Sequence, residues 1–563
     1  MIYHCEDHTC NYWDEGEKLP ERCPQCGRKL LRANEADMTG DDWTALGNTL
    51  WDAEASDKKR MVDCFRKAAY LGSAWGVCNL GICMEHGNGV EADPVQAFWL
   101  YQQAVEMGSL NAVCCLGVCY QYGIGTAPDA EKAAELYCKA AEYGSPRGQM
   151  LLARAFHDGI GVEADAAEAV HWVRAAAYQR YGEGMYRLGV CYEYGDGVEQ
   201  NWEHAVHWFR EAAESGVSAA MTDLGYCYEK GCGVEQSWEQ AFSWYRRGAE
   251  CGYPVSMSNL GLCYKRGYGV EQNWQEAIKW YEQGAQCGDL QSMHNLACCY
   301  ERGEGVEQNE ERALYWYRRG AEAGSDYCMY CLGWNYSNGE GVEQNMTEAI
   351  RWYTAAAEGG NADAMHDLGW LYDHGEGVEQ DMKKAICWYE RAAEQNHPAA
   401  MNSLGECYAM GRGVPRDLET AMEWYRRAAE LGEAMADYNM GWHLEQAGKL
   451  SEAYAHYRKA ADGNDDSAWW ALGRFYENGV VVAQDGKEAR RCYETGEKLG
   501  SVKCKMRLAR CKLLGIGGRR AKKAGLDLCR QALELAKESS EKEDYGYEAE
   551  MNLLRRTIAE NES

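Results

Sequence analysis

Four cysteines stand close together near the start of the sequence, in the stretch YHCEDHTCNYWDEGEKLPERCPQCGRKL. Cys5 and Cys10 form one pair, and Cys23 and Cys26 form a second pair of the Cys-x2-Cys type. Two pairs of thiolates on a segment too short to bury a core are typical of a tetrahedral metal site. The bound ion would supply the folding energy that burial cannot supply. The pattern therefore predicts that these four cysteines hold one metal ion.

The CPQCG knuckle and the leading YHC resemble rubredoxin-type ribbons. The first pair departs from that pattern, because four residues rather than two separate Cys5 from Cys10. The resemblance implies a small ribbon over residues 1–33, and the wider first pair favours structural Zn²⁺ over an electron-transferring iron. His4 or His8 could replace a thiolate, and the alternative is that both are solvated side chains beside the ribbon.

Most of the remaining sequence consists of a repeat of 36 residues, and any further functional site must lie on the helices that this repeat forms. Its marker is Gly-x-Gly, followed by Val in most units, with the first glycine at Gly87, Gly123, Gly159, Gly195, Gly231, Gly267, Gly303, Gly339, Gly375 and Gly411. Apolar residues follow helical spacing on both sides of each marker, as Met221, Leu224 and Tyr228 do before one of them. Each unit is therefore predicted to be a helical hairpin, and neighbouring hairpins must stack to bury their apolar faces.

The marker itself has a mechanical interpretation. Its first glycine can adopt the left-handed conformation that ends a helix. The residues after it start the next helix, with capping boxes at Ser237/Gln240, Asn273/Glu276 and Asn345/Glu348. We expect tryptophans that recur on the second helix to form a spine between repeats, with a ladder for stacking a ligand as the alternative: Trp172, Trp208, Trp244, Trp280, Trp316, Trp352, Trp388 and Trp424.

The consensus LGxCYExGxGVEQxxxxAxxWYxxAAExG resembles the Sel-one-like repeat family of the tetratricopeptide-like superfamily. The resemblance implies an all-α, right-handed solenoid superhelix of about 14 hairpins over residues 42–540, joined to the ribbon by a linker over 34–41. Residues 541–563 would add a capping helix. The unit at 444–464 lacks the glycine marker and resembles a plain tetratricopeptide hairpin.

Composition limits the class of partner. The 563 residues carry a formal charge of −30, which disfavours nucleic acid and anionic membranes and favours a neutral or basic polypeptide. No secretory signal and no run of 18 apolar residues is found, so we expect a cytoplasmic protein without a membrane span. Seven cysteines that recur at one repeat position are expected to be buried free thiols: Cys83, Cys119, Cys191, Cys227, Cys263, Cys299 and Cys407.

One segment has the opposite charge. Residues 487–523 contain 13 lysines and arginines against three glutamates, a charge of +10 that leaves −40 for the remainder. Three interpretations stay open: contact with nucleic acid or acidic lipid, self-association through attraction to the acidic body of the protein, and an ordinary solvated face.

The sequence contains no persuasive catalytic constellation, so binding is the more informative question. In tetratricopeptide-like folds the first helix of each hairpin lines the concave face, which by this resemblance would hold the partner. Partner-binding candidates on these helices are Trp334, Trp370 and Trp442, then His294, Tyr330 and His366, then Asn259, Asn295 and Asp367, although the tryptophans could instead be packing residues. Arg147, Arg154 and Arg187 could contact an anionic group, or they could be solvated.

These observations predict a non-catalytic scaffold or adaptor that binds protein or peptide partners on a concave solenoid surface. Two alternatives remain. One is a metal or redox protein in which the ribbon is the working part. The other is a delivered bacterial effector that acts on host proteins, since members of the family also serve in that way.

Overall fold

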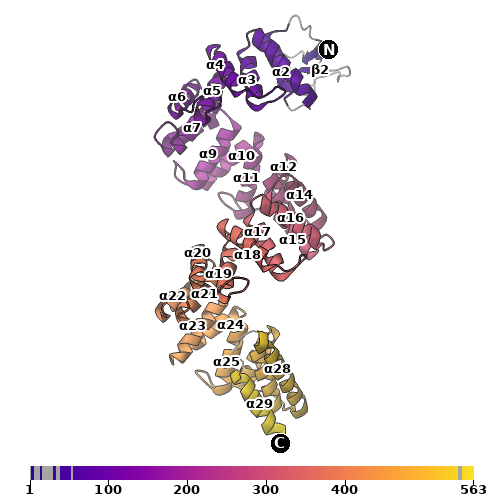
Figure 1. Cartoon of the computed structure of the whole chain (residues 1–563), viewed down its shortest axis with the longest axis vertical. Coiled ribbons are helices and arrows are strands. Elements are labelled where there is room, and N and C mark those ends of the chain that lie inside the picture. The colour runs from indigo at the N-terminus through magenta and orange to yellow at the C-terminus, as the bar shows by residue number, and fades with distance from the viewer. Residues whose placement is uncertain are drawn as a thin grey trace. The chain divides into compact units, whose positions relative to one another are not determined.

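The computed structural model describes residues 2–5, 13–15, 30–32, 38–51, 55–542 and 548–562. The chain divides into two compact units, Met1–Ser292 and Met293–Ser563. Within each unit the helices follow one another in chain order (Figure 1). The described part contains three short strands and 29 helices.

The first unit begins with an antiparallel sheet in the order β2-β1-β3. Its strands are β1 (Ile2–Cys5), β2 (Trp13–Glu15) and β3 (Leu30–Arg32). Its helices are α1 (Gly40–Thr49), α2 (Ala55–Tyr70), α3 (Ala74–His86), α4 (Pro94–Glu106), α5 (Leu110–Tyr122), α6 (Ala130–Glu142), α7 (Pro146–Asp158), α8 (Ala166–Tyr178), α9 (Gly182–Tyr194), α10 (Trp202–Glu214), α11 (Ser218–Lys230), α12 (Trp238–Glu250), α13 (Pro254–Arg266) and α14 (Trp274–Gln286).

The boundary between the units falls inside α15 (Leu290–Arg302). The second unit continues with α16 (Glu310–Glu322), α17 (Asp326–Asn338), α18 (Met346–Glu358), α19 (Ala362–His374), α20 (Met382–Glu394), α21 (Pro398–Met410), α22 (Leu418–Glu430), α23 (Ala434–Gln446), α24 (Leu450–Asp462), α25 (Asp466–Asn478), α26 (Gly486–Lys498), α27 (Val502–Leu514), α28 (Lys522–Lys542) and α29 (Glu548–Glu562).

Helices α1 to α28 follow one another as the 14 helix pairs that the repeat predicted. We call the odd-numbered first helix of each hairpin the A helix and the even-numbered second helix the B helix. From α1 to α14, and again from α16 to α28, each A helix packs on its own B helix where both belong to the range, and each B helix packs on the A helix that follows it. This is the stacking of an α-solenoid, while the right-handed superhelical twist remains a prediction.

The two glycines of the marker have different structural roles. The first, such as Gly231 after α11, ends the A helix with φ near 75°. The second, such as Gly269 with φ of 69°, packs against the preceding B helix, because an added Cβ would lie 2.1 Å from the carbonyl oxygen of Trp238. The side chains of Ser237, Asn273 and Asn345 accept hydrogen bonds from the backbone N–H groups at the starts of α12, α14 and α18, which confirms the N-cap half of each predicted capping box.

The most deeply buried contact of the repeat joins the eighth residue of the A helix to the eighth residue of the B helix. In α11 and α12 these residues are Gly225 and Tyr245, and a Cβ on the glycine would lie 2.6 Å from the tyrosine ring. The Tyr245 hydroxyl donates a hydrogen bond of 2.9 Å to Glu229. The equivalent tyrosines are Tyr101, Tyr137, Tyr281, Tyr317, Tyr353, Tyr389, Tyr425, Tyr457 and Tyr493, all buried.

In six of these ten units a tryptophan directly precedes the tyrosine, and in α10 Trp208 precedes Phe209 at the same place; these tryptophans lie at the rim of the core. Trp244 is buried, whereas Trp208, Trp280 and Trp388 are half-buried and pack against the core from its edge. An arginine three residues later covers the ring in several units, for example Arg247 at 4.2 Å from the centre of the Trp244 ring. The spine predicted from these tryptophans is therefore formed mainly by the adjacent tyrosines.

Two smaller predictions are also confirmed. Of the seven recurring cysteines, all are free thiols, six are buried and Cys191 is half-buried. Burial raises the pKa of the Cys83 thiol to about 11. The unit without the marker has a short turn between α23 and α24, in which Gly448 adopts a φ of 76°.

Candidate functional site

Three tryptophans on the A helices of the second unit present their rings to solvent. Trp334 in α17, Trp370 in α19 and Trp442 in α23 are 46%, 40% and 38% exposed. Each is the ninth residue of its helix and directly follows the glycine that packs against the B-helix tyrosine. The glycine marks the side of the A helix that packs against the B helix. The residue after it therefore lies on a different side of the A helix. We call the solvent-exposed side of the A helices the A-face.

Neighbouring side chains restrict two of these rings. The imidazole of His374 stacks on Trp370 with 4.3 Å between ring centres, and its Nδ1 lies 3.0 Å from the Trp370 carbonyl oxygen. The ring of His443 lies edge-on to Trp442 at 4.7 Å. Held aromatic rings lose little side-chain entropy when a partner covers them. Each tryptophan is thus partly covered and partly open to solvent, so both the binding interpretation and the packing interpretation remain predictions.

A row of hydrogen bonds joins the fifth and sixth positions of neighbouring A helices. The hydroxyl of Tyr330 donates to Asp367 at 3.2 Å, and Nδ1 of His366 lies 3.2 Å from the other oxygen of Asp367. His366 also stacks on His397 at 5.2 Å. Burial, with the Asp367 carboxylate beside it, raises the pKa of the Tyr330 hydroxyl. Three of the predicted binding residues therefore contact one another and form one half-buried patch beside the tryptophans.

The other predicted residues lie apart from this row. His294 in α15 contacts Cys298, with 3.6 Å between Nε2 and the sulfur, and its ring lies 5.9 Å from that of Tyr327. Asn295 follows it and is half-buried. Asn259 lies on α13 in the first unit, where it is also half-buried.

The three predicted anion contacts line one pocket of the first unit. Arg147 and Arg154 on α7 and Arg187 on α9 all border a cavity of about 670 Å³. Its apolar wall includes Val173 and Val190. The sequence singled out these arginines individually, and the stacking of α7 against α8 and of α8 against α9 brings them together.

Two charged side chains at this pocket, Arg154 and His157, already have hydrogen-bond partners within the protein. Arg154 donates a hydrogen bond of 2.6 Å to the hydroxyl of Tyr122. His157 lies 2.7 Å from Asp158 and 3.2 Å from Asp196, and its hydrogen bond to Asp158 raises the pKa of the imidazole. This histidine therefore bridges two of the carboxylates at the rim.

Sequence reasoning missed a pair of thiols behind the pocket. Cys78 and Cys115 are both buried, and Nη1 of Arg147 lies 3.7 Å from the Cys115 sulfur. A hydrogen bond from Cys78, together with the guanidinium of Arg147, lowers the pKa of Cys115. The two cysteines stand 37 residues apart, so a search at the 36-residue period could not pair them.

The basic segment 487–523 covers α26, α27 and the start of α28. It is not wholly a solvated face, because Arg507 and Arg510 both form ion pairs with Glu477. Arg519, Lys522 and Lys523 are exposed. Contact of this segment with nucleic acid and self-association through it remain predictions.

Of the four predicted metal ligands, Cys5 ends β1, whereas Cys10, Cys23 and Cys26 lie outside the described residues. The sheet places Cys5 opposite Leu30, the first residue of β3, and places His4 opposite Trp13, the first residue of β2. Elsewhere in the described part of the chain no group of three or more His, Cys, Asp or Glu side chains could hold a metal ion. No helix among the described residues is both long and apolar enough to cross a bilayer.

Comparison with known proteins agrees with this architecture. No curated protein matches the sequence. Among solved structures, a protective antigen of uropathogenic Escherichia coli with an SLR fold is 29% identical, with a TM-score of 0.51 over 85% of this chain and 97% of that chain. A Sel1 repeat protein from Oxalobacter formigenes is 32% identical over 44% of this chain and 98% of that chain, with a TM-score of 0.40.

The Sel1 repeat model matches the chain twelve times, over residues 76–109, 112–145, 146–181, 182–217, 218–253, 254–289, 290–325, 326–361, 362–397, 398–433, 434–465 and 468–501. These segments take in nearly all hairpins from α3 to α26. The chain therefore belongs to the Sel1 repeat family.

Proposed function

We propose that this protein is a non-catalytic scaffold or adaptor that binds a polypeptide partner on the A-face of its second unit. Stacked helical repeats form extended surfaces for protein interaction, and specificity then depends on the side chains that vary between repeats. The observation that carries the proposal is the set of three exposed tryptophans at one helix position, Trp334, Trp370 and Trp442. Tryptophan is among the residues most enriched at the energetic centres of protein interfaces.

The surroundings of the tryptophans support a partner that is neutral or basic. Glu406 takes the ninth position of α21, the A helix that precedes the one carrying Trp442. Arg412 neutralises part of its charge, since the guanidinium lies 3.7 Å from Glu406 and 2.9 Å from the buried Asp373. The row of Tyr330, His366 and Asp367 would add polar contacts at one side of the aromatic surface. The formal charge of −30 on the whole chain also favours partners that are not acidic overall.

We infer that the four N-terminal cysteines hold a structural Zn²⁺ ion. Three residues or fewer of sequence separate Cys10 from β2 and Cys26 from β3, and those strands start beside the Cys5 end of β1. Such short connections reach at most about 14 Å, so the strand register agrees with four thiolates near one end of the sheet. Four thiolates around zinc leave no position open for a substrate. An iron centre in the same ligands is the redox alternative.

A cytoplasmic location agrees with a scaffold, and delivery to another cell as an effector remains the alternative. Affinity capture from native lysate tests the proposal, with the wild type compared with the Trp334→Ala/Trp370→Ala double variant. The matched control is Trp99→Ala, because Trp99 is 65% exposed but lies on the B helix α4. We expect specific partners to disappear from the capture with the double variant and to remain with the control. Identical partner sets from all three proteins would contradict the proposal.

A further inference from the structure

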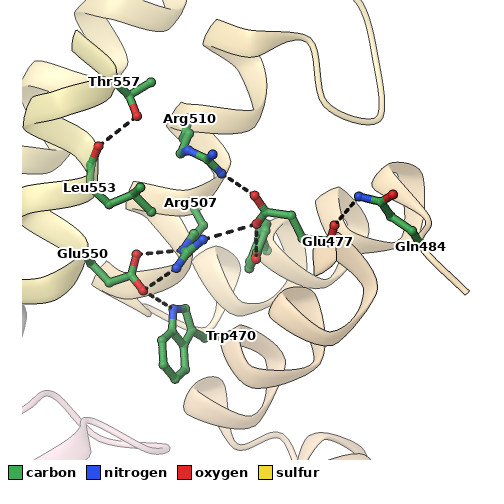
Figure 2. A network of polar contacts seen from close by, with 9 residues as sticks. Trp470, Glu477, Gln484, Arg507, Arg510, Glu550, Leu553 and Thr557 are labelled. Atoms are coloured by element: carbon green, nitrogen blue, oxygen red, sulfur yellow. Dashed lines mark hydrogen bonds and ion pairs between the residues drawn. The ribbon is translucent and has the colours of Figure 1, made fainter. Parts of the chain in front are cut away.

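The last described helix of the chain, α29, packs against both helices of the final hairpin, α27 and α28, and its Glu550 also reaches Trp470 of α25 (Figure 2). Glu550 of α29 is 7% exposed and receives hydrogen bonds of 2.7 and 2.8 Å from the guanidinium of Arg507 in α27. The indole N–H of Trp470 in α25 donates a third hydrogen bond of 3.3 Å to the same carboxylate. Side chains of two neighbouring A helices, α25 and α27, thus hold one buried glutamate of α29.

The residues that hold Glu550 occupy repeat positions that recur elsewhere. Trp470 is the fifth residue of α25, the position of Tyr330 and His366 in their helices. Arg507 is the sixth residue of α27, the position of Asp367 in α19. The contact with α29 therefore uses the same side of the A helices that carries the predicted partner-binding residues.

Helices α7 and α9 repeat the arginine positions of α25 and α27. Arg187 is the sixth residue of α9, as Arg507 is of α27. Arg154 is the ninth residue of α7, as Arg474 is of α25. Where Glu550 of α29 meets α25 and α27, the equivalent positions of α7 and α9 border the pocket of about 670 Å³.

The pocket combines positive charge with an apolar wall. Met150 takes the fifth position of α7 and lines the cavity together with Val173 and Val190. In α29, Met551 and Leu554 beside Glu550 are buried against the hairpin below. An acidic helix with apolar residues next to its glutamate therefore matches the pocket in both respects.

Among the described residues, the guanidinium of Arg187 is exposed and makes no hydrogen bond or ion pair, whereas Arg507 is fully engaged. The carboxylates at the rim are Asp158, Asp196 and Glu183, and the first two are held by His157. Arg187, exposed at this pocket and without a carboxylate partner of its own in the described part of the chain, favours an anionic group there.

We propose that the α7–α9 pocket binds a glutamate-bearing amphipathic helix of a partner protein, with the carboxylate on Arg187 and the adjacent apolar side chains against Met150, Val173 and Val190. The proposal rests on the proposed function, because it assigns a second partner contact to the A helices. The proposal specifies that the segment bound at this second contact is an acidic helix. The partner as a whole can still be neutral or basic. A carboxylate that accepts two parallel hydrogen bonds from one guanidinium would fix the orientation of the bound helix.

The test uses the full-length protein and a fluorescent peptide with the sequence of residues 548–562. In the protein, this segment pairs its Glu550 with Arg507, which takes the same helix position as Arg187. Anisotropy measures its affinity for the wild type, and the Glu550→Gln peptide is its matched control. We expect roughly tenfold or greater weakening for the Glu550→Gln peptide and for the Arg187→Gln protein, as for a lost hydrogen-bonded charge pair. Arg187→Lys should give an intermediate loss, and Arg246→Gln, an exposed arginine on the B helix α12, should give none.

Three outcomes would overturn the assignment. The first is no binding by the wild type at millimolar peptide. The second is binding that Arg507→Gln weakens and Arg187→Gln does not, because the peptide would then occupy only the α25–α27 surface. The third is self-association of the protein, seen by sedimentation, that both Arg187→Gln and Glu550→Gln abolish, which would make a second copy the occupant. Circular dichroism of each variant checks that it folds.

The result separates this inference from the proposed function. Loss of peptide binding with Arg187→Gln, while Trp334-dependent capture persists, supports both sites independently. Absence of peptide binding with intact Trp334-dependent capture removes only the α7–α9 assignment. Peptide binding without any Trp334-dependent partner removes the proposed site on the second unit and leaves the pocket in place.

Discussion

The carboxylate of Glu550 and the guanidinium of Arg507 form a two-point ion pair between the last described helix and α27, with distances of 2.7 and 2.8 Å. Both side chains are mostly buried, at 8% and 14% exposure. Arg507 also lies 3.4 Å from Glu477, so one guanidinium joins α25, α27 and α29. This contact ties α29 to the stack by charge as well as by apolar burial.

Glu550→Ala is expected to release α29 from the stack. The change leaves Arg507 buried with only Glu477 nearby, and loss of one partner of a buried pair costs about 3 kcal/mol. Hydrogen–deuterium exchange should show loss of amide protection over residues 548–562, with little change in the helices before α25. Glu548→Ala, at an exposed position on the same helix, is the control and should keep the protection. Unchanged protection in Glu550→Ala would show that apolar contacts alone hold α29.

Two glycine variants separate backbone strain from close packing. Gly252 and Gly269 both have positive φ, at 82° and 69°, so alanine at either position is strained by about 1 kcal/mol. Only at Gly269 would the added Cβ meet a neighbour, the carbonyl oxygen of Trp238 at 2.1 Å, whereas no atom lies within 4 Å at Gly252. We expect Gly269→Ala to lower the free energy of unfolding by about 1–3 kcal/mol more than Gly252→Ala does, as measured by urea denaturation. Equal midpoints for the two variants would refute the packing role of the second glycine.

Asp465 should make stability depend on pH. Burial raises its pKa to about 6, above the value of about 3.9 in an unfolded chain. The folded state therefore holds an extra proton between about pH 4 and pH 6, and the free energy of unfolding falls as pH rises through this window. Asp465→Asn keeps an acceptor for the Ala468 N–H and removes the titration, so it should stabilise the protein by roughly 1–3 kcal/mol at pH 7 and hardly at all at pH 4.

Thermal unfolding at both pH values checks this prediction. Asp485→Asn is the matched control, since Asp485 also caps a helix but is exposed. It should leave the pH profile of the wild type unchanged. An advantage of Asp465→Asn that is the same at pH 4 and pH 7 would mean that the carboxylate does not titrate in this range.

The four N-terminal cysteines should make the purified protein a zinc protein. Elemental analysis is expected to find about one zinc per chain, and Cys23→Ser should remove it because three thiolates leave the ion open to water and chelators. Cys251→Ser changes an exposed thiol on a repeat and should leave the metal content intact. Metal-free wild type would refute the site, and a coloured protein with redox-active iron would favour the redox alternative.

The repeated parts of the fold could be predicted from sequence in detail. Ten copies of the glycine marker place the ends of the A helices, and the residues after the marker place the starts of the B helices, because both depend only on local backbone chemistry. The period also placed Trp334 and Trp370 at equivalent positions of their helices, and both are partly exposed in the structure.

Contacts that break the period could not be predicted in the same way. Trp470 and Glu550 are 80 residues apart, and no repeat of the pattern indicates that α29 returns to α25. The adjacent Trp244 and Tyr245 illustrate a second limit. Both lie on the apolar stripe of α12, and only the packing of Gly225 decides that the tyrosine becomes the fully buried ring.

The second glycine of each marker has a consequence for how this protein can change in length. Gly161, Gly233 and Gly269 each touch the B helix immediately before them, so the junctions that they form between hairpins of the first unit are alike. A duplication or deletion of 36 residues in that region would create no junction of a new kind. The hairpins under α29 are different, because Trp470 and Arg507 must stay next to each other for Glu550 to reach both. Gain or loss of whole repeats is therefore structurally inexpensive in the middle of the array and disruptive beneath the final helix.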